Sequence, residues 1–146
     1  TQHIFESDPT VMYASLHQYP FYPGSGSADE MGRGDAKGTT INYPLNVGVG
    51  DDKFIDIFHN SVSDKVLKYN PDLIIVSAGF DAHMDDPIGG LRITTEGYYN
   101  ISKTIIKMAD EVCGGKIISS LEGGYNLKAL AESVEAHLLT LQGKAL

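Results

Sequence analysis

Chemically reactive side chains gather at the ends of three predicted strands. The first strand runs into residues 15–18, the second into residues 78–83 and the third into residues 122–126. Asp81 stands out, because a carboxylate at the end of a buried strand must be paired, hydrogen-bonded or bound to a metal. Asp81 is therefore a candidate metal ligand, and a helix or loop cap is the alternative interpretation.

The third strand end carries two glycines and a phenol. Gly123 and Gly124 would let the backbone approach a ligand closely, and Tyr125 could donate a hydrogen bond to a developing oxyanion. A plain strand-to-helix turn explains the same three residues without a ligand. His17 and His83 follow the other two strands, where a single imidazole more often has a structural role.

Strands and amphipathic helices alternate along the chain and must position these groups. Apolar and β-branched runs predict strands at 11–16, 40–45, 73–76 and 117–121, with a glycine-rich loop at 20–37. Apolar residues at helical spacing predict a helix capped by Asp51-Asp52 and ended by Asn70-Pro71. They also predict a helix that begins at Thr95 and is closed by Gly114-Gly115, and a helix capped by Asn126 that ends at Gly143.

Two of these elements carry specific burial expectations. The run 73–76 is continuously apolar, which is typical of a strand covered on both faces. The last helix is expected to bury an apolar stripe made of Leu127, Leu130, Val134, Leu138 and Leu141.

This alternation predicts a three-layer α/β/α protein with a mostly parallel sheet. Ligands bind beyond the carboxyl ends of the strands in such sheets, so we expect the three strand ends to lie along one rim. A length of 146 residues fits one domain.

Composition restricts the partners and the compartment. The net charge of −8 and the scattered Lys and Arg residues argue against nucleic acid and favour cationic partners. No apolar run approaches the roughly 20 residues of a membrane span. The single cysteine, Cys113, cannot form an internal disulfide, and no export signal is present, so we expect a cytoplasmic protein.

Four motifs in order give the chain a family resemblance. They are Ser-Leu-His-Gln at 15–18, Tyr-Pro-Gly-Ser-Gly at 22–26, Ser-Ala-Gly-Phe-Asp-Ala-His at 77–83 with Asp86-Pro87 behind it, and Leu-Glu-Gly-Gly-Tyr-Asn at 121–126. Together they resemble the histone deacetylase family. The motif variants look most like its bacterial and class II branch, which includes acetoin-utilisation proteins and acetylpolyamine amidohydrolases.

The resemblance implies an arginase-like α/β fold and a zinc-dependent hydrolase of acetyl-amide bonds. Acetylated lysine or an acetylpolyamine would be the substrate. Asp81 matches one of the family's zinc ligands, and Tyr125 matches the catalytic tyrosine that hydrogen-bonds the substrate carbonyl.

Further site residues follow from the same resemblance. Positions that match potassium contacts are Ser15, Leu16, Phe5, Asp8 and Val11. Positions that match the walls of a narrow acyl-lysine channel are Phe21, Tyr22, Gly123 and Gly124. Aromatic walls suit an aliphatic chain.

The family's other zinc ligands and its tandem histidines have no counterpart in this sequence. The resemblance therefore implies that residues 1–146 are the C-terminal portion of a single deacetylase catalytic domain, apparently incomplete. We expect this chain to bind zinc weakly and to be inactive alone, because a catalytic zinc usually needs three protein ligands. We also expect it to self-associate or to pair with the missing N-terminal half.

Two other classes of function stay open. One is a non-catalytic binding or assembly half-domain. The other is a nucleotide or phosphate binder, since Gly24 and Gly26 begin a G-x-G pattern. Asp29 occupies the third glycine position of that pattern, which argues against nucleotide binding.

Overall fold

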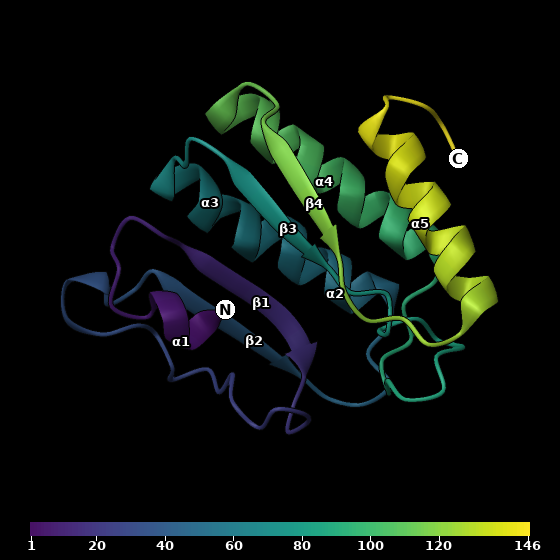
Figure 1. The fold of residues 1–146 in the computed structure, drawn as a ribbon, viewed down its shortest axis with the longest axis horizontal. Coiled ribbons are helices and arrows are strands. Elements are labelled where there is room, and N and C mark those ends of the chain that lie inside the picture. The colour runs from purple at the N-terminus through teal and green to yellow at the C-terminus, as the bar shows by residue number, and fades with distance from the viewer. The chain divides into compact units, whose positions relative to one another are not determined.

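The strands of the chain pair in parallel and alternate with helices, as Figure 1 shows for the computed structural model, which describes residues 1–146. The chain divides into two units, residues 1–47 and residues 48–146. Each unit contains one parallel strand pair.

The first unit is built on two strands. Helix α1 (Gln2–Phe5) precedes β1 (Tyr13–Gln18), and the short 3-10 helix η1 (Gly34–Ala36) precedes β2 (Thr40–Leu45). The predicted strand at 40–45 is confirmed. The strand predicted at 11–16 begins and ends two residues later.

A local turn explains the later start of β1. The Asp8 carboxylate accepts hydrogen bonds from the Thr10 backbone N–H at 2.9 Å and from its hydroxyl at 2.6 Å. Pairing begins only at Tyr13, whose N–H donates to the Thr39 carbonyl. Residues 20–37 form a loop as predicted except for η1, and α1 was not predicted because four residues show no helical periodicity.

The second unit begins with one long helical segment. It consists of α2 (Asp51–Ile57), the π-helical segment η2 (Phe58–Val62) and α3 (Ser63–Tyr69). The predicted helix is confirmed, and Asn70 ends it in the left-handed region with φ of 55°. The π turn was not predicted.

The elements that follow match the prediction closely. They are β3 (Ile74–Ala78), α4 (Thr95–Cys113), β4 (Ile117–Leu121) and α5 (Leu127–Leu141). Helices α2 to α4 lie behind β3 and β4 in the view of Figure 1. Asn126 caps α5 as predicted, because its side chain accepts hydrogen bonds from the backbone of Lys128 and Ala129.

The predicted cap of the first long helix is wrong. Gly50 is the N-cap residue of α2, and no side chain caps it. The Asp51 carboxylate instead accepts hydrogen bonds from the Thr94 backbone N–H at 2.9 Å and from its hydroxyl at 2.6 Å. Thr94 in turn caps α4, so this contact ties the starts of α2 and α4 together.

The core of the second unit forms around three buried residues. Phe80, Ile93 and Tyr98 pack together, and the Phe80 and Tyr98 ring centroids lie 5.0 Å apart. Burial of β3 on both faces was wrongly predicted, because Ile75 is 67% exposed. Its neighbour across the strand pair, Ile118, is 54% exposed, so this chain leaves one face of the pair open.

The apolar stripe predicted for the last helix is wrong in part. Leu127 is 80% exposed and Leu138 is 49% exposed, whereas Leu130 and Val134 pack against the core. The residues that α5 buries are small or polar: Ala129, Ser133, Ala136, His137 and Thr140. Among them, His137 has polar partners on neighbouring elements, Ser102 and Ser119.

The predicted α/β class is confirmed: the chain has parallel strands that alternate with packed helices. None of its helices has both the length and the apolar character that crossing a membrane requires.

Candidate active site

Two of the predicted strand ends meet in the second unit. Strands β3 and β4 are paired in register to their last residues, Ala78 and Leu121. The contact continues beyond them, because Glu122 N–H donates to the Ala78 carbonyl at 3.0 Å and Phe80 N–H donates to the Gly123 carbonyl at 2.7 Å. The segments that carry Asp81 and Tyr125 therefore leave the sheet side by side.

Asp81 lies against the glycine turn. A Cβ at position 123 would collide with the Asp81 carboxylate, so only glycine leaves room for it. Burial raises the pKa of Asp81 above its ordinary value, and the negative charges of Asp86 and Glu122 add to this effect. A cation bound at this edge would therefore favour the ionised form of Asp81, which burial alone disfavours.

Gly124 is required by conformation as well as by space. Its φ is +145°, and a Cβ there would lie 2.9 Å from the Leu130 side chain and 3.1 Å from that of Phe80. The two glycines thus fit the backbone between the Asp81 carboxylate and the core. Tyr125 follows directly.

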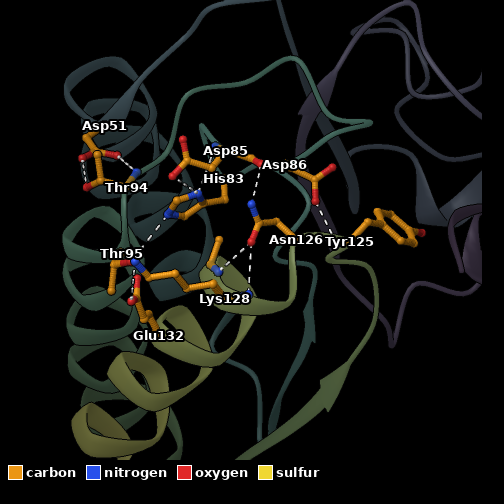
Figure 2. Close-up of polar contacts among 11 residues, drawn as sticks. Asp51, His83, Asp85, Asp86, Thr94, Thr95, Tyr125, Asn126, Lys128 and Glu132 are labelled. Atoms are coloured by element: carbon orange, nitrogen blue, oxygen red, sulfur yellow. Dashed lines mark hydrogen bonds and ion pairs between the residues drawn. The ribbon is translucent and has the colours of Figure 1, made fainter.

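Tyr125 is held by its backbone and exposes its ring. Its N–H donates a 2.8 Å hydrogen bond to the Asp86 carboxylate. The side chain is 54% exposed, and its ring points away from the other labelled side chains in Figure 2. The phenol is therefore exposed and could donate a hydrogen bond to a ligand.

His83 has the structural role that a lone strand-end imidazole suggests. It is 6% exposed, and its Nδ1 accepts a 3.1 Å hydrogen bond from the Asp85 N–H. Since Nδ1 accepts, Nε2 carries the proton and faces the Thr95 hydroxyl at 3.5 Å. Both nitrogens of His83 are thus occupied within the protein.

The remaining predicted site residues belong to the first unit. Ser15 donates from its hydroxyl to His17 Nδ1 at 2.9 Å, and His17 Nε2 donates to the Gly26 carbonyl at 2.9 Å. His17 is therefore also structural, and it fastens the glycine-rich loop to β1. Of the predicted channel residues in this unit, Phe21 is 43% exposed and Tyr22 is 92% exposed.

The predicted potassium contacts of the first unit have mixed surroundings. The Asp8 carboxylate is engaged by Thr10, and these hydrogen bonds lower the pKa of Asp8. Phe5 and Val11 are partly buried, and Leu16 lies next to Ser15 on β1. The ion-binding role of all five residues stays a prediction.

The structure shows no group of three or more His, Cys, Asp or Glu side chains that could hold a metal ion. Asp81 has the chemistry of a single ligand, whereas a catalytic zinc usually needs three protein ligands.

A contact that the sequence did not reveal joins two parts of this edge. The Asp86 carboxylate accepts hydrogen bonds from the nearby N–H groups of Ile88 and Gly89, as a turn-capping aspartate does. Its bond to Tyr125 spans 39 positions. No local pattern signals a bond over that distance.

Comparison with known proteins identifies the family. Residues 1–141 match the family model of the histone deacetylase domain, and the chain belongs to this family.

Several relatives cover nearly the whole chain. The chain is 42% identical to histone deacetylase 14, chloroplastic, of Arabidopsis thaliana over 144 residues, which are 99% of this chain and 34% of that protein. It is 38% identical to a probable deacetylase of Archaeoglobus fulgidus over 128 residues, which are 88% of this chain and 36% of that protein.

Solved structures agree with the fold. The HDA15 HD domain has a TM-score of 0.91 and 40% identity, and the match covers 99% of this chain and 40% of that one. The histone deacetylase Clr3 has a TM-score of 0.92 and 39% identity, with 99% and 25% covered. The chain thus spans about a third of the length of the two relatives named above.

Proposed function

We propose that this chain supplies the C-terminal part of the active site of a zinc-dependent deacetylase that hydrolyses acetyl-amide bonds. The observation that carries the proposal is the contact between the Asp81 carboxylate and the glycine turn that presents Tyr125. The proposal is supported because Asp81 and the turn that carries Tyr125 lie at the same edge of the sheet. Family membership supports deacetylase chemistry.

Each of the two residues has a definite role in this proposal. Asp81 would be one of the zinc ligands, and a bound zinc would act as a Lewis acid toward the acetyl carbonyl. Tyr125 donates a hydrogen bond from its exposed phenol to the carbonyl oxygen, where negative charge develops during hydrolysis. Gly123 leaves room for the Asp81 carboxylate.

The chain alone is inactive in this account. Asp81 is a single ligand, and the described residues contain no group of three that could hold a metal. The other ligands and the acid and base groups are supplied by residues outside this sequence. Potassium at Ser15, Leu16, Phe5, Asp8 and Val11 is a further part of the proposal.

The substrate is an acetylated lysine or an acetylpolyamine. The net charge of −8 favours substrates that carry other, unacetylated amines, such as lysine-rich peptides or polyamines, because acetylation neutralises the modified amine itself. Phe21 and Tyr22 would contact the aliphatic chain of the substrate, and their exposed aromatic side chains are suited to such a contact. The role of Gly123 and Gly124 as channel residues rests on the family resemblance alone.

The open face of β3 and β4 supports association with a complementary segment. Ile75 and Ile118 are neighbours on this face, and both are more than half exposed. Covering two exposed isoleucines removes apolar surface from water, which favours binding. The complementary partner would be the N-terminal part of the domain, or a second copy of the chain.

A non-catalytic binding or assembly module is the second candidate, favoured by the absence of a three-ligand group in this chain. The two candidates differ in what they predict for the chain joined to the N-terminal part of a deacetylase domain. A deacetylase should then bind one zinc per molecule and hydrolyse an acetyl-lysine peptide. A binding module should fold in this context without either property.

Zinc content measured by elemental analysis provides the test. We call the chain joined to the N-terminal part of a deacetylase domain the completed domain. In it, Asp81→Asn should lose most of the bound zinc, because an amide is a poorer ligand than a carboxylate. Asp110→Asn removes the same charge from an exposed position of α4 and should keep the zinc. Equal zinc content in both variants would contradict the role of Asp81.

A further inference from the structure

The Asp86 carboxylate holds two separate segments of the second unit. One oxygen, Oδ2, accepts a 2.8 Å hydrogen bond from the backbone N–H of Tyr125. The other, Oδ1, accepts 2.9 Å hydrogen bonds from the N–H groups of Ile88 and Gly89. Figure 2 shows Asp86 facing the backbone of Tyr125. A single side chain thus bridges the loop after β3 and the turn after β4.

A second bond runs alongside the first. The Asn126 side-chain amide donates a 2.9 Å hydrogen bond to the Asp85 carbonyl, while its oxygen caps α5. Adjacent residues of the loop therefore hold adjacent residues of the turn. Two bonds at successive positions restrict rotation of the turn more than one bond would.

The ionised state of Asp86 strengthens this contact. Partial burial raises the pKa of Asp86, but hydrogen bonds from four backbone amides outweigh that effect, and the pKa lies below its ordinary value. Amide bonds to a carboxylate are roughly twice as strong as those between neutral groups. Asp86 is therefore ionised at neutral pH and accepts strong hydrogen bonds.

The backbone of Tyr125 has few other attachments in the described contacts. Gly123 and Gly124 precede it and offer conformational freedom, while the phenol ring is 54% exposed. A flexible turn would spread the phenol over many positions, whereas oxyanion stabilisation needs a donor held at a fixed place. Neighbouring bonds hold Gly123 and Asn126, and the contact with Asp86 holds the N–H of Tyr125 between them.

We propose that Asp86 is the positioning residue that fixes Tyr125 at the edge of the sheet through the Tyr125 backbone N–H. The proposal rests on the proposed function for the role of the phenol, but the contact itself can be tested without any deacetylation. Asp86 does not touch the substrate in this account. It acts through Tyr125.

Backbone amide exchange of the 146-residue chain, followed by NMR, tests the contact directly. In the unmodified chain the Tyr125 amide should exchange slowly. In Asp86→Asn it should exchange at least about tenfold faster, because one oxygen cannot serve both segments. The Leu130 amide, bonded to the Asn126 carbonyl inside α5, should change less than about twofold.

The control variant is Asp85→Asn. It removes the same charge from the neighbouring position. The Asp85 side chain is 65% exposed, and the Tyr125 N–H bonds to Asp86 and not to Asp85. Exchange at Tyr125 should be unchanged in this control. Slow exchange at Tyr125 in Asp86→Asn would overturn the proposal. Fast exchange of this amide in the unmodified chain would also overturn it, even if the variant failed to fold.

Turnover in the completed domain separates this proposal from the proposed function. Asp86→Asn should lower kcat about tenfold or more with KM within about threefold, and Asp86→Glu, which keeps two acceptor oxygens, should recover part of kcat. A normal kcat in Asp86→Asn would overturn the positioning role. Normal turnover of Tyr125→Phe would instead contradict the proposed function and leave the exchange result intact.

Discussion

The Asp81 carboxylate occupies the space that a Cβ at Gly123 would need. Asp81 follows β3 and Gly123 follows β4, and the Phe80 N–H to Gly123 carbonyl bond holds the two segments together. The glycine is thus explained by the acid beside it. Residues 42 positions apart in the sequence form one local structure.

Gly123→Ala should therefore displace Asp81 and lower the free energy of unfolding by roughly 1–3 kcal/mol, the usual cost of overpacking. Urea denaturation measures this change. In the completed domain the same variant should also lose zinc.

The matched control for this prediction is Gly50→Ala. Gly50 has an ordinary φ of −106°, and a Cβ there would lie 3.4 Å from the Arg92 carbonyl, an ordinary contact. The control should lower the free energy of unfolding by no more than about 1 kcal/mol, because alanine is a poorer N-cap residue than glycine. Equal losses in both variants would show that the Asp81 contact is not the cause.

His137 should make the stability of the chain depend on pH. Ser102 donates its hydroxyl proton to the Tyr98 carbonyl, so the 2.7 Å contact between His137 Nδ1 and Ser102 requires a protonated Nδ1. Nε2 then accepts from the Ser119 hydroxyl at 2.9 Å. The imidazole is neutral, and burial lowers the pKa of His137 below its ordinary value of 6.5.

The lowered pKa of His137 determines how the stability changes with pH. Below about pH 6.5 the unfolded chain gains a proton on His137, whereas the folded chain resists protonation. The free energy of unfolding is therefore highest above that pH and falls as the pH drops below it. Between pH 6.5 and 5 the wild type should lose up to about 1.4 kcal/mol per pH unit more than His137→Leu. Urea denaturation at a series of pH values measures both slopes. Parallel slopes over this range would refute the prediction.

Asn126 should contribute to stability through two separate bonds. Asn126→Ala removes the cap of α5 and the bond to the Asp85 carbonyl, and it should cost about 1–2 kcal/mol of unfolding free energy. Asn126→Ser keeps a capping oxygen but has no amide to reach Asp85. Thermal unfolding should therefore place Ser between Asn and Ala, and a Ser variant as unstable as Ala would argue against the capping contribution.

Local signals in the sequence predicted most of the elements. The cap at Asn126, the helix from Thr95 to Cys113 and the strand from Ile117 to Leu121 all agree with the structure. Each depends on residues close in sequence, such as Gly114, which ends its helix in the left-handed conformation. The class of fold followed from the alternation of these elements.

Contacts between distant residues were not predictable in the same way. Asp51 looked like a cap, but it accepts from Thr94, 43 positions away. The leucines of α5 looked like its buried face, but hydrogen bonds at His137 make a polar residue the better one to bury. Burial of Ile75 on a covered face requires a layer that this chain does not provide.

The same distinction between local signals and contacts of distant residues applies to the candidate site. Family motifs pointed to Asp81 and Tyr125, and the structure brings their segments together at the ends of β3 and β4. The bond from Tyr125 to Asp86 arises only from folding. The roles of the residues in the first unit are still predictions from resemblance.

The most direct test of the central claim is turnover of an acetyl-lysine peptide by the completed domain with Tyr125 changed to Phe. The variant removes one hydroxyl from an exposed ring, so folding and zinc content should be unchanged. If Tyr125 donates to the acetyl carbonyl, kcat should fall about 100-fold or more. Turnover equal to that of the unmodified domain would contradict the account.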